Sequence, residues 1–257
     1  MPGSYTEPDW DHETRFFLPN EDAEVVRQAL EALPRKVEEA VFITGSGFLA
    51  LDILPSLAQE LHLECIDRSP FQRDYCLNLI RILGFAASPE DILNFVHEQI
   101  VPKINAYYGE RGQSYSHEGI EKALHELFRI RFLKDQTWLN QVKVRLKRVQ
   151  VTCANAVDAV ASRSRLDFIH LSNIIDYLDQ ESLQRLFQAL RKHAAFVFAI
   201  ETSACRNSEQ LAELFSAYGF QEDESSPRLQ RMNRALGCSH STRPWMRTGR
   251  VHLLIPA

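Results

Sequence analysis

The chain lacks a long apolar run, a paired-cysteine motif and a positive net charge, and each absence narrows its function. No stretch approaches the roughly 20 apolar residues that span a bilayer, so we expect no membrane insertion. Five cysteines occur without a CxxC pair, which gives no sign of a structural zinc site. The net charge of -5 provides no basic field to attract nucleic acid. Unpaired cysteines are typical of a reducing compartment, and the acidic first residues do not resemble a targeting peptide, so we expect a cytoplasmic protein.

Glycine is also sparse, with 10 in 257 residues, yet two of the ten lie in one short turn. The apolar run Val41–Ile43 is typical of a buried strand, and the turn Thr44–Gly47 (TGSG) follows it. Phe48–Leu61 is predicted to be a helix, and His62–Ile66 a second strand that ends at Asp67. A carboxylate roughly 20 residues after a glycine-rich strand-to-helix turn can accept both ribose hydroxyls of a nucleotide. The pattern therefore favours a nucleotide-type site, and a plain strand–helix–strand unit with a tight corner is the alternative.

The chain divides into an N-terminal part, residues 1–36, and an α/β domain, residues 37–257. Residues 1–36 hold an amphipathic helix preceded by the aromatics Trp10, Phe16 and Phe17, which we expect to act as a lid. The strand–helix alternation stops at about residue 86 and resumes at about 148. Between these points we predict an all-helical insertion that covers the strand ends.

Polar residues follow several predicted strands at the point where each strand ends. Alternating strands and helices predict a mostly parallel sheet with helices on both faces. Ligands bind beyond the carboxyl ends of such strands, so these polar residues should converge on one site. They are Gly45, Asp67, Asn155, Ser172, Asn173 and Ser203.

The order of these motifs resembles the class I S-adenosylmethionine-dependent methyltransferase fold. The TGSG turn, Asp67, the pair Asn155-Ala156 and the segment LSNIIDYL come in that family's order. A dinucleotide dehydrogenase is disfavoured, because the turn lacks the third glycine of GxGxxG. More narrowly, Phe168–Leu178 (FIHLSNIIDYL), the segment IDRSPFQ and the helical insertion resemble the branch that transfers the 3-amino-3-carboxypropyl group.

The resemblance implies S-adenosylmethionine as a substrate, a small-molecule reaction and no metal. It assigns cofactor binding to Gly45, Ser46, Gly47, Asp67, Arg68, Asn155, Ala156, Ser172 and Asn173. It makes Asp176 and Tyr177 candidates to orient the substrate amine or accept its proton, with Asn140 and Ser203 as further catalytic candidates.

Each of these roles has a structural alternative. Asp67 could instead cap the next helix, Asn155 could be a turn residue, and Asp176 and Tyr177 could cap and pack. The insertion aromatics could face the sulfonium or pack in the core; they are Tyr107, Tyr108, Tyr115 and Trp138. His170, inside a predicted buried strand, is interpreted as a core residue with its hydrogen bonds satisfied.

The sequence leaves three hypotheses for the activity open. Attack at Cγ of the methionine chain releases methylthioadenosine, either by cyclisation to azetidine-2-carboxylate, which we favour, or by transfer to an acceptor. Attack at the methyl group would make the protein an ordinary methyltransferase. A binding module without turnover is the third hypothesis.

Overall fold

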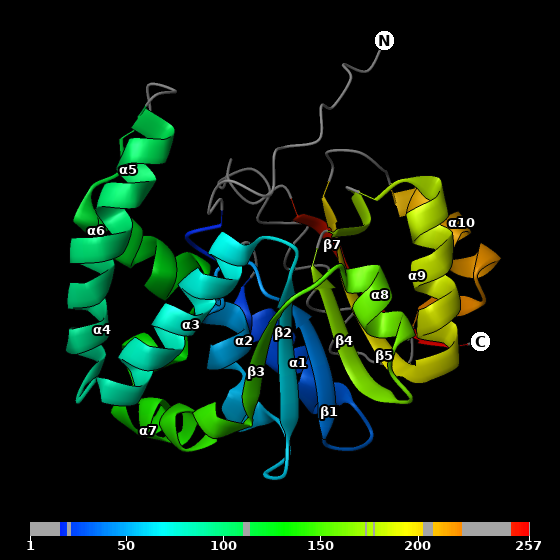
Figure 1. The fold of residues 1–257 in the computed structure, drawn as a ribbon, viewed down its shortest axis with the longest axis horizontal. Helices are drawn as coiled ribbons and strands as arrows, with labels where there is room; N and C mark the ends of the chain where they lie inside the picture. The colour runs from blue at the N-terminus through cyan, green and yellow to red at the C-terminus, as the bar shows by residue number, and fades with distance from the viewer. Residues whose placement is uncertain are drawn as a thin grey trace.

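The computed structural model describes residues 16–19, 22–109, 114–172, 174–176, 178–202, 208–222 and 248–256. A seven-stranded sheet forms its centre, in the order β3-β2-β1-β4-β5-β7-β6 (Figure 1). The strands are β1 (Glu39–Ile43), β2 (His62–Asp67), β3 (Val149–Cys153), β4 (Leu166–Ser172), β5 (Ala194–Thr202), β6 (Phe220–Glu222) and β7 (Thr248–Pro256). Strands β1 to β5 pair in parallel, and β7 is antiparallel to both β5 and β6. The predicted fold class, a mostly parallel α/β sheet, is confirmed.

Helices cover both faces of the sheet, because consecutive strand residues point to opposite faces and are apolar on each. Phe42, Phe168 and Phe198 pack with α1 (Ala23–Ala32), α2 (Phe48–Asp52) and α3 (Pro70–Phe85). Their sequence neighbours pack on the other face, with α8 (Ala156–Ala161), α9 (Gln180–His193) and α10 (Ser208–Ala217). Figure 1 shows α8, α9 and α10 on the right of the sheet and α3 on the left. Two layers of core therefore hold the sheet between them.

The helix predicted over Phe48–Leu61 is much shorter in the structure. Helix α2 ends at Asp52, and a 3₁₀ turn, Leu54–Ser56, replaces its continuation. Pro55 explains the difference, because proline has no N–H to donate and its ring clashes with the carbonyl one turn earlier.

Between α3 and β3 the described residues form helices and no strand. They are α4 (Pro89–Phe95), a π-helical segment Val96–Ile100, α5 (Val101–Gly109), α6 (His117–Lys122), a second π-helical segment Ala123–Leu127, a 3₁₀ helix Arg131–Leu133, α7 (Gln136–Arg145) and a 3₁₀ helix Leu146–Arg148. Figure 1 shows α4, α5 and α6 standing beside α3, and α7 near the amino end of β3. The insertion thus forms a side wall. Its apolar residues pack into the core that contains α3, and its covering of the strand ends stays a prediction.

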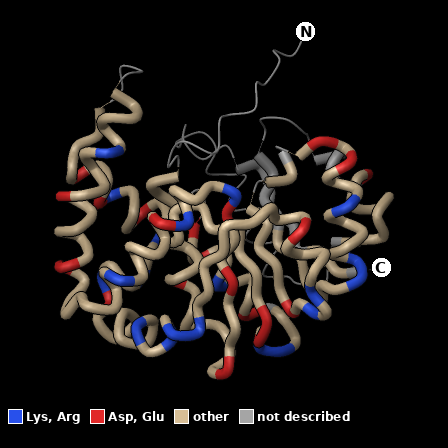
Figure 2. The backbone as a smooth tube through the Cα atoms, in the orientation of Figure 1, with Lys and Arg blue, Asp and Glu red and all other residues tan. Residues whose placement is uncertain are grey.

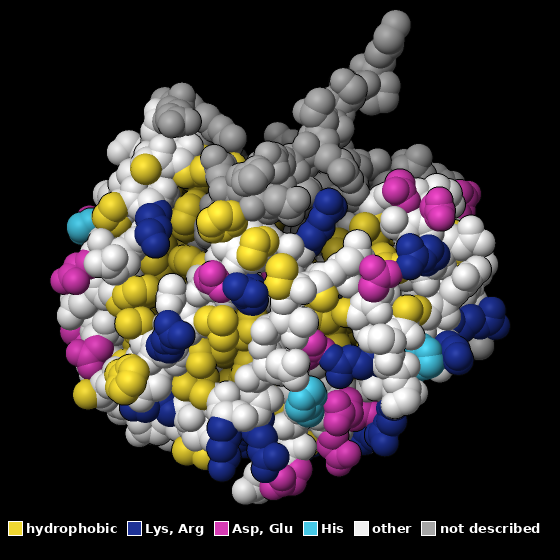
Figure 3. All heavy atoms as spheres, in the orientation of Figure 1, with side chains coloured by type: hydrophobic (Ala, Val, Ile, Leu, Met, Phe, Trp, Pro, Cys, Tyr) yellow, Lys and Arg dark blue, Asp and Glu magenta, His cyan; other side chains and the backbone are white. Residues whose placement is uncertain are grey.

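The face of the molecule seen in Figures 2 and 3 mixes charges and carries an apolar region. In Figure 2, Lys and Arg are interspersed with Asp and Glu. In Figure 3, hydrophobic side chains gather over α3 and the neighbouring insertion helices. Among the described helices, none combines the length and hydrophobicity needed to cross a membrane.

Candidate functional site

The glycine turn connects β1 to α2 and has one crowded side and one open side. Gly45 and Gly47 both adopt left-handed backbone conformations, with φ of +48° and +80°. A Cβ on Gly47 would lie 2.7 Å from the Cys76 sulfur, so close packing against α3 requires glycine there. A Cβ on Gly45 would have no described atom within 4 Å apart from its chain neighbours. A ligand could therefore approach the main chain at Gly45.

Asp67, at the carboxyl tip of β2, lies beside this turn. Its Oδ1 accepts a hydrogen bond of 2.9 Å from the amide of Ser69. Burial raises the pKa of Asp67 to about 6, and contacts with the backbone amides of Ser69, Gly45 and Arg68 oppose that shift. The carboxyl group thus both braces the start of α3 and sits next to the glycine turn. The structural and functional interpretations of Asp67 are compatible.

Two hydroxyl groups of the same turn are buried without a hydrogen-bond partner among the described residues. They are Thr44 Oγ1 and Ser46 Oγ, in residues that are 4% and 3% exposed. Buried polar groups are nearly always paired, and an unpaired one costs about 1–3 kcal/mol. Their position suits a polar ligand group or an ordered water.

The tip of β3 brings Asn155 and Ala156 to the same end of the sheet. Asp67 is in register with Cys153, and the amide of Ala154 donates to the carbonyl of Asp67 at 2.9 Å. Asn155 is exposed and caps α8, its Oδ1 accepting from the amide of Val157 at 2.8 Å, while Ala156 is buried. Asn155 therefore has the structural role of a turn residue at a place where it can also meet a ligand.

Strand β4 ends in an unusual conformation at Ser172. This residue is 7% exposed and has a φ of 52°, and the register with β5 shifts between His170 and Ser172. A non-glycine residue with positive φ stores strain and is frequent at functional sites. The structure therefore brings together Gly45, Ser46, Gly47, Asp67, Arg68, Asn155, Ala156 and Ser172.

The predicted catalytic residues are less well placed. Asn140 is exposed on α7, where its Oδ1 accepts from the Gln136 side chain at 3.1 Å. Since α7 leads into the amino end of β3, the structure does not bring Asn140 to the carboxyl ends of the strands. Asp176 closes a 3₁₀ turn directly after β4, and its side chain is outside the described part. Asn173, Tyr177 and Ser203 lie outside the described residues, so their roles stay predictions.

A short segment, Phe16–Pro19, which we call the N-terminal strap, docks on α3 next to the glycine turn. The Gln72 side chain bonds to both backbone groups of Phe16 and to the carbonyl of Gly45. The Tyr75 hydroxyl donates to the carbonyl of Phe17 at 2.8 Å. Sequence reasoning missed Gln72, because a glutamine in the first turn of a helix carries no local signal of a partner 56 residues away.

Three of the insertion's tyrosines pack against the strap and one another. The Phe17 ring meets Tyr75 and Tyr107 edge-on, with centroids 6.1 and 6.0 Å apart. Tyr107 meets Tyr108 at 4.9 Å, and Tyr108 meets Tyr115 at 5.6 Å. Of the two hypotheses for these aromatics, the contacts favour packing.

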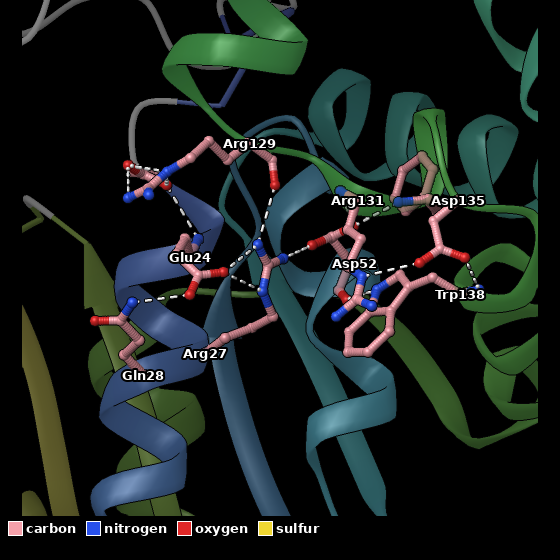
Figure 4. A network of polar contacts seen from close by, with 10 residues as sticks. Glu24, Arg27, Gln28, Asp52, Arg129, Arg131, Asp135 and Trp138 are labelled. Carbon is pink, nitrogen blue, oxygen red and sulfur yellow. Dashed lines mark hydrogen bonds and ion pairs between the residues drawn. The ribbon is translucent and has the colours of Figure 1, made fainter.

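A buried polar network around Asp52 joins α1, α2 and the insertion (Figure 4). The Asp52 carboxylate forms an ion pair with Arg27 of α1 and accepts from the amides of Arg131 and Phe132 at 2.6 and 3.0 Å. Its backbone carbonyl accepts from the Trp138 indole at 2.9 Å, and the Arg131 guanidinium stacks 4.2 Å from that ring. Trp138 is therefore a structural residue. Sequence analysis did not detect the network.

His170 is buried, as predicted, but neither ring nitrogen has a hydrogen-bond partner among the described residues. The ring lies nearly parallel to Phe42 and Phe198, at 4.8 and 5.1 Å. Burial lowers the pKa of His170 to about 3, with a small opposing effect of its own backbone. The prediction that its hydrogen bonds are satisfied is wrong, because no polar group of the described residues bonds to either nitrogen at the edge of the ring.

The strand order, with an antiparallel seventh strand inserted between the fifth and sixth, defines a class I methyltransferase fold. No protein-family model and no curated protein sequence matches the chain. Among the described residues, no group of three or more His, Cys, Asp or Glu side chains is arranged to hold a metal ion.

Solved structures with a similar arrangement include two methyltransferases and a cyclase. A SAM-dependent methyltransferase from Aquifex aeolicus is 13% identical with a TM-score of 0.46, covering 83% of this chain and 86% of that one. Magnesium protoporphyrin IX methyltransferase from Synechocystis is 8% identical with a TM-score of 0.47, covering 91% and 77%. The [4+2]-cyclase SpnF is 13% identical with a TM-score of 0.45, covering 91% and 78%. The class of fold rests on the strand order and not on these likenesses.

Proposed function

We propose that the protein binds S-adenosylmethionine at the carboxyl ends of β1, β2 and β4 and uses it as a substrate. The observation that carries the proposal is that Asp67 lies directly beside the glycine turn. Ile43 is in register with Ile66, and the amide of Thr44 donates to the carbonyl of Ile66 at 2.8 Å. The open side of the turn, at Gly45, and the acidic side chain of Asp67 therefore lie next to each other. A carboxylate there can accept hydrogen bonds from both ribose hydroxyls, while the methionine part passes over the turn.

The remaining site residues have roles that fit this pose. The unpartnered hydroxyls of Thr44 and Ser46 are available to the methionine carboxylate. Asn155 and Ala156, past β3, would meet the adenine edge. The left-handed Ser172 and the following Asn173 would turn main-chain groups toward the amine and carboxylate, and Ser203 would lie across the site.

For the reaction we propose cyclisation, as in azetidine-2-carboxylate synthase, an enzyme of the aminocarboxypropyl branch. The neutral α-amine forms a bond to Cγ, the Cγ–sulfur bond breaks, and its electron pair remains on sulfur in methylthioadenosine. The ring nitrogen then loses a proton, for which Asp176 or Tyr177 is the proposed acceptor. Support comes from the resemblance of Phe168–Leu178 to that branch.

The protein's own contribution to such a reaction is to fold the chain and exclude water. A sulfonium is already a good leaving group, so positioning the amine near Cγ removes much of the barrier. Water is the competing nucleophile, and keeping it out needs a cover over the methionine end. The strap beside the glycine turn supports a covering role for the segment from Trp10 to Phe17.

Product analysis separates the possible reactions in one experiment. The purified protein is incubated with S-adenosylmethionine and the nucleoside product is identified by mass spectrometry. We expect methylthioadenosine without any added acceptor, matched one-for-one by azetidine-2-carboxylate. Methylthioadenosine that forms only after an acceptor is added would replace cyclisation with transfer. S-adenosylhomocysteine would indicate a methyltransferase, and absence of S-adenosylmethionine binding would refute the proposal.

A further inference from the structure

Gln72 is a buried polar side chain to which the proposed chemistry assigns no role. It lies in the first turn of α3, which Ser69 caps, and it is 1% exposed. Its Nε2 donates to the Phe16 carbonyl at 2.9 Å and also to the Gly45 carbonyl. Its Oε1 accepts from the Phe16 amide at 3.2 Å. One side chain therefore contacts the strap and the glycine turn together.

Three of the four hydrogen bonds that this amide can form are made with these two partners. A glutamine side chain carries two N–H donors and one carbonyl oxygen that can accept two bonds. Both donors and the oxygen are engaged, two of the three bonds with Phe16 and one with Gly45. Because the site is buried, a movement of either partner leaves polar groups unpaired, which is unfavourable. The positions of Phe16 and Gly45 are thus linked through Gln72.

A second anchor, Tyr75, holds the strap, and its described hydrogen bond goes to the strap and not to the turn. The Tyr75 hydroxyl donates to the carbonyl of Phe17, and the two rings meet edge-on. Tyr75 lies one turn further along α3, and the described hydrogen bond of its hydroxyl goes to the strap. Gln72 and Tyr75 therefore offer a matched comparison: both bond to the strap, and Gln72 also bonds to Gly45.

We propose that Gln72 is a positioning residue that couples the glycine turn to the N-terminal strap. A ligand that holds the turn also holds Phe16–Pro19 against α3, and loosening the strap loosens the turn. The ligand in question is a nucleoside sulfonium such as S-adenosylmethionine, so this part rests on the proposed function. Coupling of this kind holds the strap more firmly against α3 when the methionine end is occupied.

Hydrogen–deuterium exchange on four proteins tests the coupling without ligand: wild type, Tyr75→Phe, Gln72→Met and the double variant. Tyr75→Phe removes one strap bond, and we expect exchange at residues 44–48 to accelerate roughly 3- to 10-fold, as loss of about one hydrogen bond predicts. In the Gln72→Met background the same change should leave residues 44–48 unaffected. Equal acceleration in both backgrounds, or none in wild type, overturns the proposal.

Protection of α9 (Gln180–His193), on the other face of the sheet, reports whether each variant is folded. If Gln72→Met does not fold, Gln72→Glu takes its place. It keeps the length of the side chain and the oxygen that accepts from the Phe16 amide, and it replaces the amide nitrogen that donates to the carbonyls of Gly45 and Phe16. The results expected for Gln72→Glu, and those that would overturn the proposal, are the ones given for Gln72→Met.

Adding S-adenosylmethionine tests the ligand part. In wild type and in Tyr75→Phe, exchange at residues 16–19 should slow on binding, and in Gln72→Met it should not. Slowing in Gln72→Met equal to wild type refutes transmission through Gln72. If calorimetry finds no binding to wild type, the proposed function fails, and the ligand-free comparison still decides whether strap and turn are coupled.

Discussion

Replacing Asp52 with alanine should destabilise the protein more than any other single change in the network of Figure 4. The Asp52 side chain is 0% exposed and pairs with Arg27, whose side chain is 6% exposed. Alanine would leave that guanidinium without its buried partner and would orphan the amides of Arg131 and Phe132. Breaking a buried pair from one side costs about 3–5 kcal/mol. In a chain of this size that lowers the melting temperature by roughly 10 °C.

Two further variants give the measurement its controls. Glu24→Ala removes the other carboxylate on Arg27, but Glu24 is 33% exposed, so urea denaturation should show a loss below ~1 kcal/mol. Arg27→Met removes the cation and leaves the carboxyl group. A loss for Asp52→Ala no greater than for Glu24→Ala would refute the assignment of Asp52 as the centre of the network.

The pH dependence of Arg27→Met provides a second, independent check. Burial raises the pKa of Asp52 to about 6, and Arg27 opposes that rise. Because the folded pKa lies above the unfolded one, this group favours folding at low pH, and its contribution is lost as the pH rises through about 6. Without Arg27 the folded pKa lies higher still. The stability difference from wild type should therefore widen between about pH 5 and pH 8, by ~1.4 kcal/mol per unit of additional shift. A difference independent of pH would contradict this account.

Three other predictions concern the site. Asp67→Ala should weaken S-adenosylmethionine binding more than ~10-fold, measured by calorimetry. The affinity of wild type should also fall roughly tenfold from about pH 7 to pH 5, because the carboxylate with a pKa of about 6 must be ionised to accept both ribose hydroxyls. The affinity of Asp67→Asn should not depend on pH in this way. Gly47→Ala should lower stability more than Gly45→Ala, because only the Gly47 Cβ meets Cys76; equal losses in urea denaturation would contradict the packing argument. His170→Phe should raise stability by about 1–3 kcal/mol by removing two unpaired nitrogens. It should also remove the loss of stability that wild type shows as the pH falls from about 6.5 toward 3, since the folded pKa is depressed.

The sheet and the turn were predictable because their signals are local. Apolar runs marked the strands, and the TGSG turn with Asp67 after the next strand indicated where the site lies. Pro55 is also a local signal, and it marks the end of the helix that begins at Phe48. The contacts of Gln72 and Asp52 join residues 25 to 86 positions apart, so no periodicity or spacing in the sequence predicts them. The position of Asn140 depended on where the insertion packs, which its helical pattern does not specify.

The antiparallel strand β7 has a consequence for how the chain is made. Strand β5 pairs with β4 on one side and with β7 on the other, although 45 positions separate Thr248 from the end of β5 at Thr202. During synthesis β4 and β5 leave the ribosome first, and the outer edge of β5 has no partner until Thr248–Pro256 emerges. An unpaired apolar edge strand is a template for association with other chains. The nascent protein therefore has an aggregation-prone interval that ends when its seventh strand closes the sheet, and truncation before β7 would make that interval permanent.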